Sequence, residues 1–235
     1  MEAINTMKRY EVKYVLTNEQ LNFLEEALKG HMEVDQYGLT SIASIYYDTP
    51  DCRLIRDSME KPFYKEKMRL RSYGLSKPGS TVYLELKKKN GGIVYKRRVG
   101  TTEETVNKFL DYQGTITEDG QIAKEITYFR DYYNKLVPMF LIIYDRVAYY
   151  QPDGDLRLTI DRNPRYRTDN LNLTTSMDGT SILPKGGAIL EIKVQQAMPL
   201  WLTSILSKGN IYKSSFSKVG EAHKMQMRLL MQERA

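Results

Sequence analysis

Residues 81–100 read TVYLELKKKNGGIVYKRRVG and contain the pattern that decides the fold. Leu84 and Leu86 alternate with Glu85 and Lys87 along this segment. Side chains two positions apart in a β-strand point to the same face of the sheet. The segment therefore predicts a strand with one apolar face and one charged face. A single strand of this kind is ordinary, because its charged face is usually solvated.

The same alternation recurs in five other segments that read as strands. Each places two charges on one face and apolar or aromatic residues on the other, and most of the charges are cationic. Six such strands indicate a sheet curled around a polyanion. The five further segments are Glu11-Val12-Lys13, Arg69-Leu70-Arg71, Lys96-Arg97-Arg98, Arg157-Leu158-Thr159-Ile160-Asp161 and Glu191-Ile192-Lys193.

Periodicity and turn signals predict eight strands and six helices. Thr17 and Gln20 form a predicted capping box at the start of the first helix. Asn90-Gly91 predicts a hairpin, because a type I′ turn needs positive φ at both central positions. Residues 163–186 are polar and predict a loop with at most one short strand. Strands are expected at 8–16, 41–48, 67–74, 81–89, 93–100, 141–150, 155–161 and 188–194, and helices from Thr17 to Gly30, around Leu54 and Ile55, and at 102–111, 121–136, 199–208 and 217–232.

Hairpins and short helical insertions join most of these strands, which favours an antiparallel sheet. We expect an α+β fold, namely a closed eight-stranded antiparallel β-barrel, or tunnel, with helices packed on the outside. A barrel of eight strands has room inside for side chains or one small ligand. No Pro/Gly/Ser-rich linker interrupts the sequence, so residues 1–235 are expected to form a single domain.

The charged faces allow two interpretations. In one, apolar side chains fill the interior and the charges meet water. In the other, outer helices cover the apolar face and the charges point into the barrel. The predicted helices have apolar stripes that need a sheet face, and the chain has too few aliphatic residues for an interior core as well. We therefore expect a charged tunnel, whose cations would repel one another unless an anion occupied it.

The composition is consistent with an anionic ligand. The chain has 35 Lys and Arg against 29 Asp and Glu, a formal charge of +6 and a pI near 9.1. This excess is spread along the sequence, which argues against a nucleic-acid-binding arm. Arginine grips phosphate oxygens bidentately, and lysine acts as a point charge. The interspersed glutamates suit Mg²⁺ or Mn²⁺, hard cations that bridge carboxylate and phosphate oxygens.

Several other chemistries lack support in the sequence. A single cysteine, Cys52, excludes an internal disulfide, and only two histidines, His31 and His223, are available for a zinc site or a Ser-His-Asp triad. Neither a Walker A loop nor a GxGxxG motif occurs. No secretory signal is recognisable, and the longest apolar run, 138–143, is far shorter than the roughly 20 residues of a membrane span. We expect a cytoplasmic protein without a membrane span.

Taken in order, these segments resemble the VTC domain, the polyphosphate polymerase domain of the vacuolar transporter chaperone, which is a member of the triphosphate tunnel metalloenzymes. The likeness spans about residues 8–222 and is specific only as a set. It is carried by Arg9-Tyr10-Glu11-Val12-Lys13-Tyr14, Ser44-Ile45-Tyr46-Tyr47-Asp48-Thr49, Arg69-Leu70-Arg71-Ser72-Tyr73-Gly74, Leu84-Glu85-Leu86-Lys87, Tyr95-Lys96-Arg97-Arg98, Tyr144-Asp145-Arg146, Arg157-Leu158-Thr159-Ile160-Asp161, Leu190-Glu191-Ile192-Lys193 and Phe216-Ser217-Lys218.

The resemblance implies transfer of the γ-phosphate of ATP onto a growing polyphosphate chain. It implies a divalent cofactor, Mn²⁺ or Mg²⁺, held by Glu191, and ATP with polyphosphate or triphosphate as ligands. The residues implied to bind phosphates during catalysis are Lys13, Arg69, Arg71, Lys87, Lys96, Arg146, Arg157 and Lys218. Those implied to contact substrate are Tyr144, Lys193, Arg98, Glu11, Glu85 and Ser217.

Two positions depart from the family pattern. Arg9 stands where the related hydrolases have the first Glu of Glu-x-Glu-x-Lys, which favours polymerase over triphosphatase chemistry. Ser215 stands where the family has a basic residue, and Lys213 is a candidate substitute. Three functions therefore stay open: a polyphosphate polymerase, an inorganic or nucleoside triphosphatase, and a non-catalytic polyphosphate-binding module. The sequence also leaves open the preferred nucleotide, the oligomeric state and any membrane partner that accepts the product.

Overall fold

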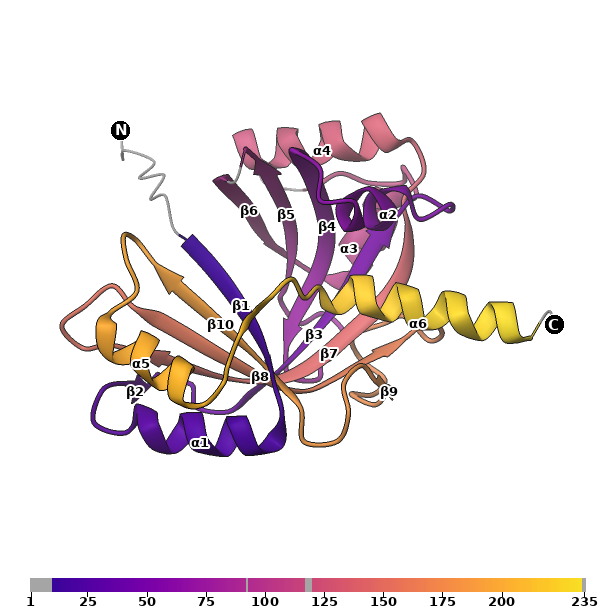
Figure 1. Ribbon diagram of the computed structural model, residues 1–235. Coiled ribbons are helices and arrows are strands. Elements are labelled where there is room, and N and C mark those ends of the chain that lie inside the picture. Colours follow the sequence, from indigo (N-terminus) through magenta and orange to yellow (C-terminus); the bar gives the residue numbers. More distant parts are fainter. Residues whose placement is uncertain (1–9, 92, 117–119, 234–235) are drawn as a thin grey trace. The chain divides into compact units, whose positions relative to one another are not determined.

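A computed structural model describes residues 10–91, 93–116 and 120–233 (Figure 1). Arg9, one of the two departures from the family pattern, lies outside these ranges. The described chain contains eight strands of seven or more residues, and each overlaps one of the eight predicted strands. They are β1 (Tyr10–Leu16), β3 (Thr40–Asp48), β4 (Tyr64–Tyr73), β5 (Val82–Asn90), β6 (Ile93–Thr101), β7 (Val137–Tyr150), β8 (Arg157–Arg167) and β10 (Ala188–Val194).

Three two-residue strands were not predicted, because two residues are too few to show alternation. They are β2 (Glu33–Val34), β9 (Thr180–Ser181) and β11 (Lys213–Ser214). The six predicted helices are confirmed as α1 (Asn18–Leu28), α2 (Arg53–Met59), α3 (Glu103–Leu110), α4 (Gln121–Tyr133), α5 (Leu200–Lys208) and α6 (Lys218–Gln232). Within the described ranges, none of these helices is long and apolar enough to span a bilayer.

The sheet confirms the α+β class but not the closed barrel. Its hydrogen-bonded order is β11-β1-β10-β8-β7-β3-β4-β5-β6, with β2 beside β7 and β9 beside β8. The registers defined for its strand pairs are antiparallel. Among the described residues this order starts at β11 and ends at β6, so the prediction of an eight-stranded closed barrel is wrong. One reason lies in β1, whose second edge pairs with β11 at Lys13 and Tyr14.

The chain is organised as two compact units. The first unit comprises residues 1–40, 144–164 and 183–216, and the second comprises 41–143, 165–182 and 217–235. β7 and β8 each contribute residues to both units. The single domain expected for residues 1–235 stays a prediction.

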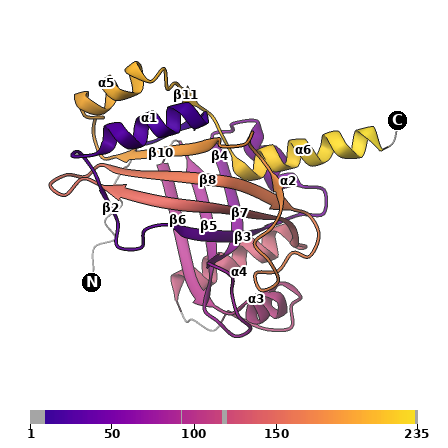
Figure 2. The ribbon, with the colours of Figure 1, turned by 90° about the horizontal axis from the view of Figure 1, so that it is seen from below.

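In the first unit, α1 and α5 lie side by side over one face of β1, β10 and β8 (Figure 2). Leu24 of α1 and Leu202 of α5 are fully buried there against Leu190 of β10 and Leu158 of β8. The alternate positions of β10, Glu191 and its neighbours at i±2, lie on the opposite face. The helices therefore cover the apolar face, as the second interpretation of the charged strands requires.

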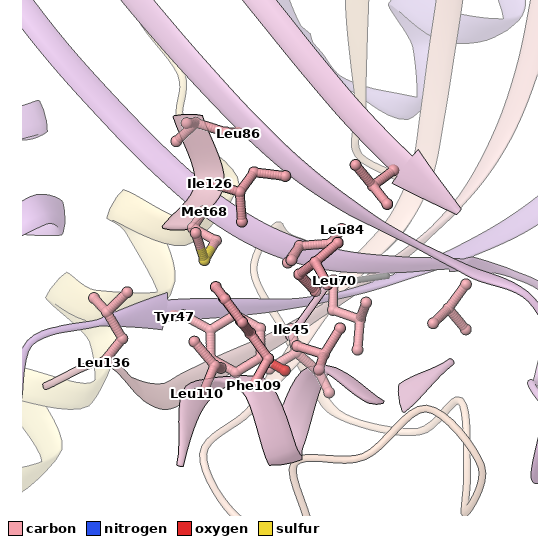
Figure 3. Close-up of a cluster of buried hydrophobic side chains, with 14 of the residues drawn as sticks. Ile45, Tyr47, Met68, Leu70, Leu84, Leu86, Phe109, Leu110, Ile126 and Leu136 are labelled. Atoms are coloured by element: carbon pink, nitrogen blue, oxygen red, sulfur yellow. The ribbon is translucent and has the colours of Figure 1, made fainter. Parts of the chain in front are cut away.

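In the second unit, helices α3 and α4 cover the apolar face of β4, β5 and β6 (Figure 3). Leu70, Leu84 and Leu86 of the strands pack with Phe109 of α3 and Ile126 of α4, and all five are fully buried. Burying a side chain of this size contributes about 1.5–3 kcal/mol. The alternation that decided the prediction thus assigns the even-numbered positions of β4 and β5 to the helix interface and the odd-numbered positions to the charged face.

Local signals located the element ends with one error of register. The capping box is present: Gln20 N donates to Thr17 Oγ1 at 3.2 Å, and Thr17 N donates to Gln20 Oε1 at 3.0 Å. The hairpin between β5 and β6 pairs Asn90 with Ile93. Asn90 therefore closes the strand and Gly91, with φ of 54°, opens the turn. The predicted turn at Asn90-Gly91 was one residue too early.

Candidate functional site

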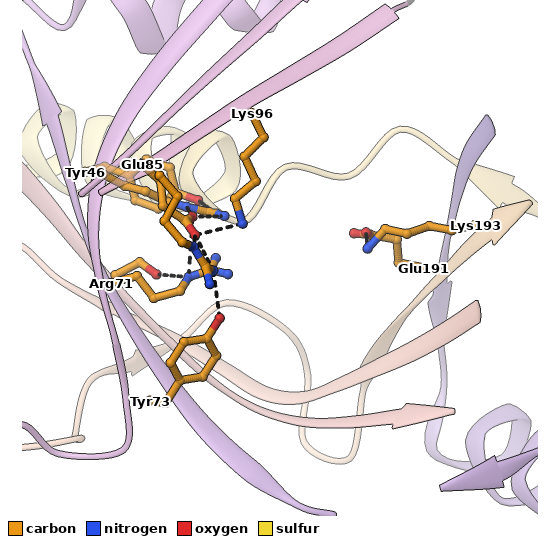
Figure 4. A network of polar contacts seen from close by, with 10 residues as sticks. Tyr46, Arg71, Tyr73, Glu85, Lys96, Glu191 and Lys193 are labelled. Carbon is orange, nitrogen blue, oxygen red and sulfur yellow. Dashed lines mark hydrogen bonds and ion pairs between the residues drawn. The ribbon is translucent and has the colours of Figure 1, made fainter. Parts of the chain in front are cut away.

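The charged face of the second unit carries one carboxylate surrounded by cations, the Glu85 cluster of Glu85, Arg69, Arg71, Lys96 and Arg98. Arg69 Nε donates to Glu85 Oε2 at 2.7 Å, and Arg98 Nε donates to Oε1 at 2.8 Å (Figure 4). Lys96 Nζ lies 2.7 Å from Oε1, and Arg71 Nε lies 3.9 Å from Oε2. The Glu85 side chain is only 1% exposed. Burial would raise its pKa, but Arg69 and Arg71 outweigh burial and hold the pKa well below its usual range.

Two tyrosine hydroxyls hold the arginines of this cluster in place. Arg69 Nη1 donates to Tyr46 Oη at 3.0 Å, and Arg98 Nη2 donates to Tyr73 Oη at 2.8 Å. The guanidinium of Arg98 also lies 4.6 Å from the centroid of the Tyr83 ring. Side chains already restrained in this way lose less rotamer freedom when an anion binds, which favours affinity.

The cluster contains two groups whose ionisation is displaced toward neutral pH. Burial would raise the pKa of Tyr46, but the charges of Arg69 and Lys67 lead the opposing effects and lower it to about 7. Burial lowers the pKa of Lys96 to about 8, although Glu85 opposes that shift. The net charge of the cluster therefore changes between about pH 7 and pH 8.

A row of lysines continues the charged face beside the Glu85 cluster. Lys67, Lys87 and Lys96 lie opposite one another on β4, β5 and β6. Lys67 Nζ lies 3.4 Å from the hydroxyl of Ser217, the N-cap residue of α6. Lys218, predicted to bind phosphate, is the first residue of that helix. The second unit thus brings the predicted residues of three strands next to the predicted residues at the start of α6.

The first unit contains a second group, the Glu191 cluster of Glu191, Lys13, Lys193 and Glu11. Lys193 Nζ lies 2.7 Å from Glu191 Oε1, and Lys13 Nζ lies 3.6 Å from Oε2 and 3.4 Å from Glu11 Oε1 (Figure 4). Lys13 and Glu191 are also opposite each other in the strand register. Burial would raise the pKa of Glu191, but Lys193 and Lys13 outweigh burial and lower that pKa far below its usual range.

Three further predicted residues lie on the strands of the first unit. Arg146 of β7 forms a bidentate pair with Asp161 of β8, at 2.5 Å from Nε to Oδ1 and 2.8 Å from Nη2 to Oδ2. The guanidinium of Arg146 lies 5.1 Å from the centroid of the Tyr144 ring. Arg157 is exposed and lies opposite Lys193 in the register of β8 and β10.

Sequence reasoning missed four residues that position the cations. Tyr46, Tyr73 and Ser44 hold arginines of the Glu85 cluster, with Arg71 Nε donating to Ser44 Oγ at 3.2 Å. Asp161 is fully buried and neutralises Arg146. A signal for Ser44 and Tyr46 was available, because they are two apart on β3 and share one face. Tyrosines in strands were instead interpreted as packing residues.

The carboxylates of the described chain do not form a metal site by themselves. No group of three or more His, Cys, Asp or Glu side chains suited to a metal ion occurs in residues 10–91, 93–116 and 120–233. Glu191 is buried and ionised, and Mg²⁺ is commonly bound by one or two carboxylates together with substrate phosphates. The residues therefore fit a metal that is shared with a phosphate ligand, with Glu191 as the protein's contribution.

Comparison with known proteins identifies the family. The VTC domain matches residues 8–226, so the chain belongs to the VTC domain family. No curated protein matches the chain.

Two solved structures share the fold. One, from Vibrio parahaemolyticus and named "putative adenylate cyclase", has 12% sequence identity and a TM-score of 0.51, and the match covers 92% of this chain and 98% of that one. The other, from Bacillus halodurans and with the same name, has 13% identity and a TM-score of 0.55, covering 90% and 96%. At this level of identity the likeness concerns the fold alone.

Proposed function

We propose that this chain is a metal-dependent phosphotransferase that moves the γ-phosphate of ATP onto a polyphosphate chain. The observation that carries the proposal is the Glu85 cluster, in which one buried carboxylate faces four cations. Such an excess of cations is compensated best by an anion with several charges, and linear polyphosphate carries one charge or more on each phosphate. Membership of the VTC domain family supports the same ligand class.

Electrostatic stabilisation is the proposed source of catalysis. Arg69, Arg71 and Arg98 present planar guanidinium groups that bind two phosphate oxygens each, while Lys87 and Lys96 add point charges. Phosphoryl transfer needs little from a protein beyond positioning and charge neutralisation. Lys13, Lys193, Arg146 and Arg157 of the first unit, together with Lys218, Ser217, Tyr144 and Glu11, are proposed to contact phosphates or nucleotide in the same reaction.

Glu191 is proposed to hold the divalent metal together with phosphate oxygens. A bound Mn²⁺ or Mg²⁺ would supply further neutralisation of the phosphate oxygens. The protein's own part is to keep Glu191 ionised, which Lys13 and Lys193 do by lowering its pKa. These lysines also occupy both carboxylate oxygens in the absence of ligand, so the metal is expected to bind only together with an anion that draws the lysines away.

A product assay tests this function directly. Purified protein incubated with ATP and Mn²⁺ is expected to produce ADP and polyphosphate that is visible on a gel. Orthophosphate as the only product would assign a triphosphatase instead. Tight binding of tripolyphosphate without turnover under any divalent metal would assign a non-catalytic polyphosphate-binding module.

Tripolyphosphate binding is expected to weaken as the pH rises from 6.5 to 9. Below pH 7 Tyr46 is neutral and Lys96 is charged, so the cluster is most cationic. Above pH 8 the tyrosine is ionised and the lysine is neutral, which removes two positive charges. One pKa unit of displacement corresponds to about 1.4 kcal/mol, or a tenfold change in affinity for each group. Isothermal titration calorimetry at constant ionic strength measures the profile.

Tyr46→Phe separates the two groups. Phenylalanine keeps the ring but cannot ionise, so the decrease near pH 7 should vanish while the decrease near pH 8 remains. The ligand itself gains charge as the pH rises, and this acts in the opposite direction in both proteins. Tyr95→Phe on β6 is the matched control, and it should keep the wild-type profile. Identical profiles for wild type and Tyr46→Phe would show that Tyr46 does not titrate in this range.

A further inference from the structure

The second unit contains a tyrosine-walled pocket on the face of the sheet that does not carry the Glu85 cluster. Its volume is about 350 Å³, which lies in the range of small-molecule sites. Tyr64 and Glu66 line it from β4, and these even-numbered positions face away from Arg69 and its odd-numbered neighbours. Tyr128 and Tyr132 of α4 line it from the other side.

Glu66 is the only member of the pocket's carboxylates that is buried without a cationic partner in the described chain. Its side chain belongs to a residue 9% exposed. Tyr64 Oη donates to Oε2 at 2.7 Å, and Tyr133 Oη donates to Oε1 at 2.8 Å. Both donors are neutral, because burial and the bond to Glu66 raise the pKa of each phenol. A buried carboxylate with only neutral partners is costly, and a cation beside it would lower that cost.

The cations that line the pocket are engaged with other carboxylates. Arg53 Nε lies 3.8 Å from Asp57 Oδ2, and Lys88 Nζ lies 4.0 Å from an oxygen of Glu125. No lysine or arginine of the described ranges lies within the 4.0 Å ion-pair distance of Glu66. The pocket therefore keeps one uncompensated negative charge.

The tyrosine rings supply the remaining walls. Tyr128 and Tyr132 are one helical turn apart on α4, with ring centroids separated by 6.1 Å and planes inclined by 25°. Tyr133 meets Tyr132 edge-on, at 5.0 Å and 86°. Tyr128 is 67% exposed and Tyr132 is 57% exposed, an unusual amount of open aromatic surface. The faces of such rings are electrostatically negative and attract cations.

We propose that this pocket binds a substituted ammonium cation, with the charged nitrogen facing Glu66 and its alkyl groups against the tyrosine rings. One buried carboxylate and several aromatic faces match this chemistry in both charge and polarity. A hard metal ion fits less well, because it requires six or more oxygen ligands. The same chemistry occurs in free quaternary amines and in a trimethylated lysine side chain, and the experiment distinguishes these two sources.

Choline and its neutral carbon isostere, dimethylbutanol, test the charge requirement. The two probes have nearly the same shape, so calorimetry or ligand-detected NMR on the full chain compares cation with neutral directly. Choline is expected to bind saturably at one site per chain, and the isostere at least tenfold more weakly, which is the low end of a cation–π and ion-pair contribution. Equal binding of both probes, or no saturable binding of choline, would overturn the proposal.

Variants locate the site. Glu66→Gln keeps both tyrosine hydrogen bonds possible, and Tyr132→Ala removes an exposed ring, so both are expected to fold, as circular dichroism can verify. Each should weaken choline binding by about five- to thirtyfold. Tyr37→Ala, which removes an exposed tyrosine of the first unit, is the matched control and should bind as wild type does. Unchanged choline binding in both pocket variants would place the bound cation elsewhere and refute the assignment.

The source of the cation is read from a second titration. A trimethyllysine peptide that competes with choline more strongly than free trimethyllysine would identify a modified protein tail as the ligand. Equal competition would identify a free amine. Both results keep the pocket as an ammonium site, and tripolyphosphate binding by the Glu85 cluster should be the same in Tyr132→Ala and wild type.

Discussion

Replacing Glu85 by glutamine is expected to lower the free energy of unfolding by about 3 kcal/mol in the absence of ligand. Removing one partner from a buried charge network typically costs about 3–5 kcal/mol, because the other charges remain buried and unpaired. The lower end applies here, since the Lys96 side chain is 42% exposed and the Arg98 side chain 35% exposed, so both can regain water. Chemical denaturation monitored by circular dichroism measures the loss.

Tripolyphosphate should then stabilise Glu85→Gln more than it stabilises the wild type. In the wild type, the carboxylate and the phosphate oxygens compete for Arg69 and Arg98, whereas in the variant the ligand alone supplies the negative charge. A larger rise in melting temperature on adding tripolyphosphate is the expected signature. The sign of this difference separates an anion site from a structural network, in which the ligand would stabilise neither protein.

Glu125→Gln is the matched control for this experiment. Glu125 also pairs with two cations of the second unit, Arg97 at 3.2 Å and Lys88 at 4.0 Å. These three residues lie at α4 and at the positions of β5 and β6 that alternate with the charged face, and Glu125 is 20% exposed. We expect a smaller loss of stability and a ligand-induced shift equal to that of wild type. An enhanced shift in this control would mean that any lost carboxylate increases anion binding through net charge alone.

The sequence predicted the strands well because the two faces of each strand differ chemically. Leu84 and Leu86 pack under helices and Glu85 faces cations, so alternation along the sequence reports the alternation in space. Prediction failed where no period exists. The two residues of β11 carry no alternation, yet their pairing with β1 occupies the edge that a closed barrel would have needed.

The candidate site was predicted by residue type but not by pairing. Glu85 was expected to contact substrate, and the structure makes it the counter-ion of four cations. Such a role depends on which residues stand opposite in the register, and one strand's sequence does not contain that information. Tyr46 was missed for the same reason, since its displaced pKa arises from Arg69 on the neighbouring strand.

The position of Glu191 between two lysines makes its role testable by substitution. A glutamine there is expected to reduce Mn²⁺-dependent turnover of ATP by a hundredfold or more, about 3 kcal/mol of transition-state stabilisation, because a neutral amide is a poor ligand for a hard dication. Tripolyphosphate binding measured without metal should persist or tighten, since Lys13 and Lys193 remain. The loss of stability should be small, because both lysine side chains are about 30% exposed and can be hydrated.

The Mn²⁺ concentration dependence distinguishes a metal ligand from a structural ion pair. Lys193→Gln breaks the 2.7 Å pair but leaves the carboxylate in place. If Glu191 binds the metal, Glu191→Gln should raise the Mn²⁺ concentration for half-maximal turnover, whereas Lys193→Gln should weaken the phosphate ligand and leave that concentration nearly unchanged. If Glu191 serves only to neutralise the lysines, the two variants should lose activity alike, and turnover by Glu191→Gln should keep the wild-type dependence on Mn²⁺. In that case the divalent ion would be bound through phosphate oxygens alone, and Glu191 would be excluded as its ligand.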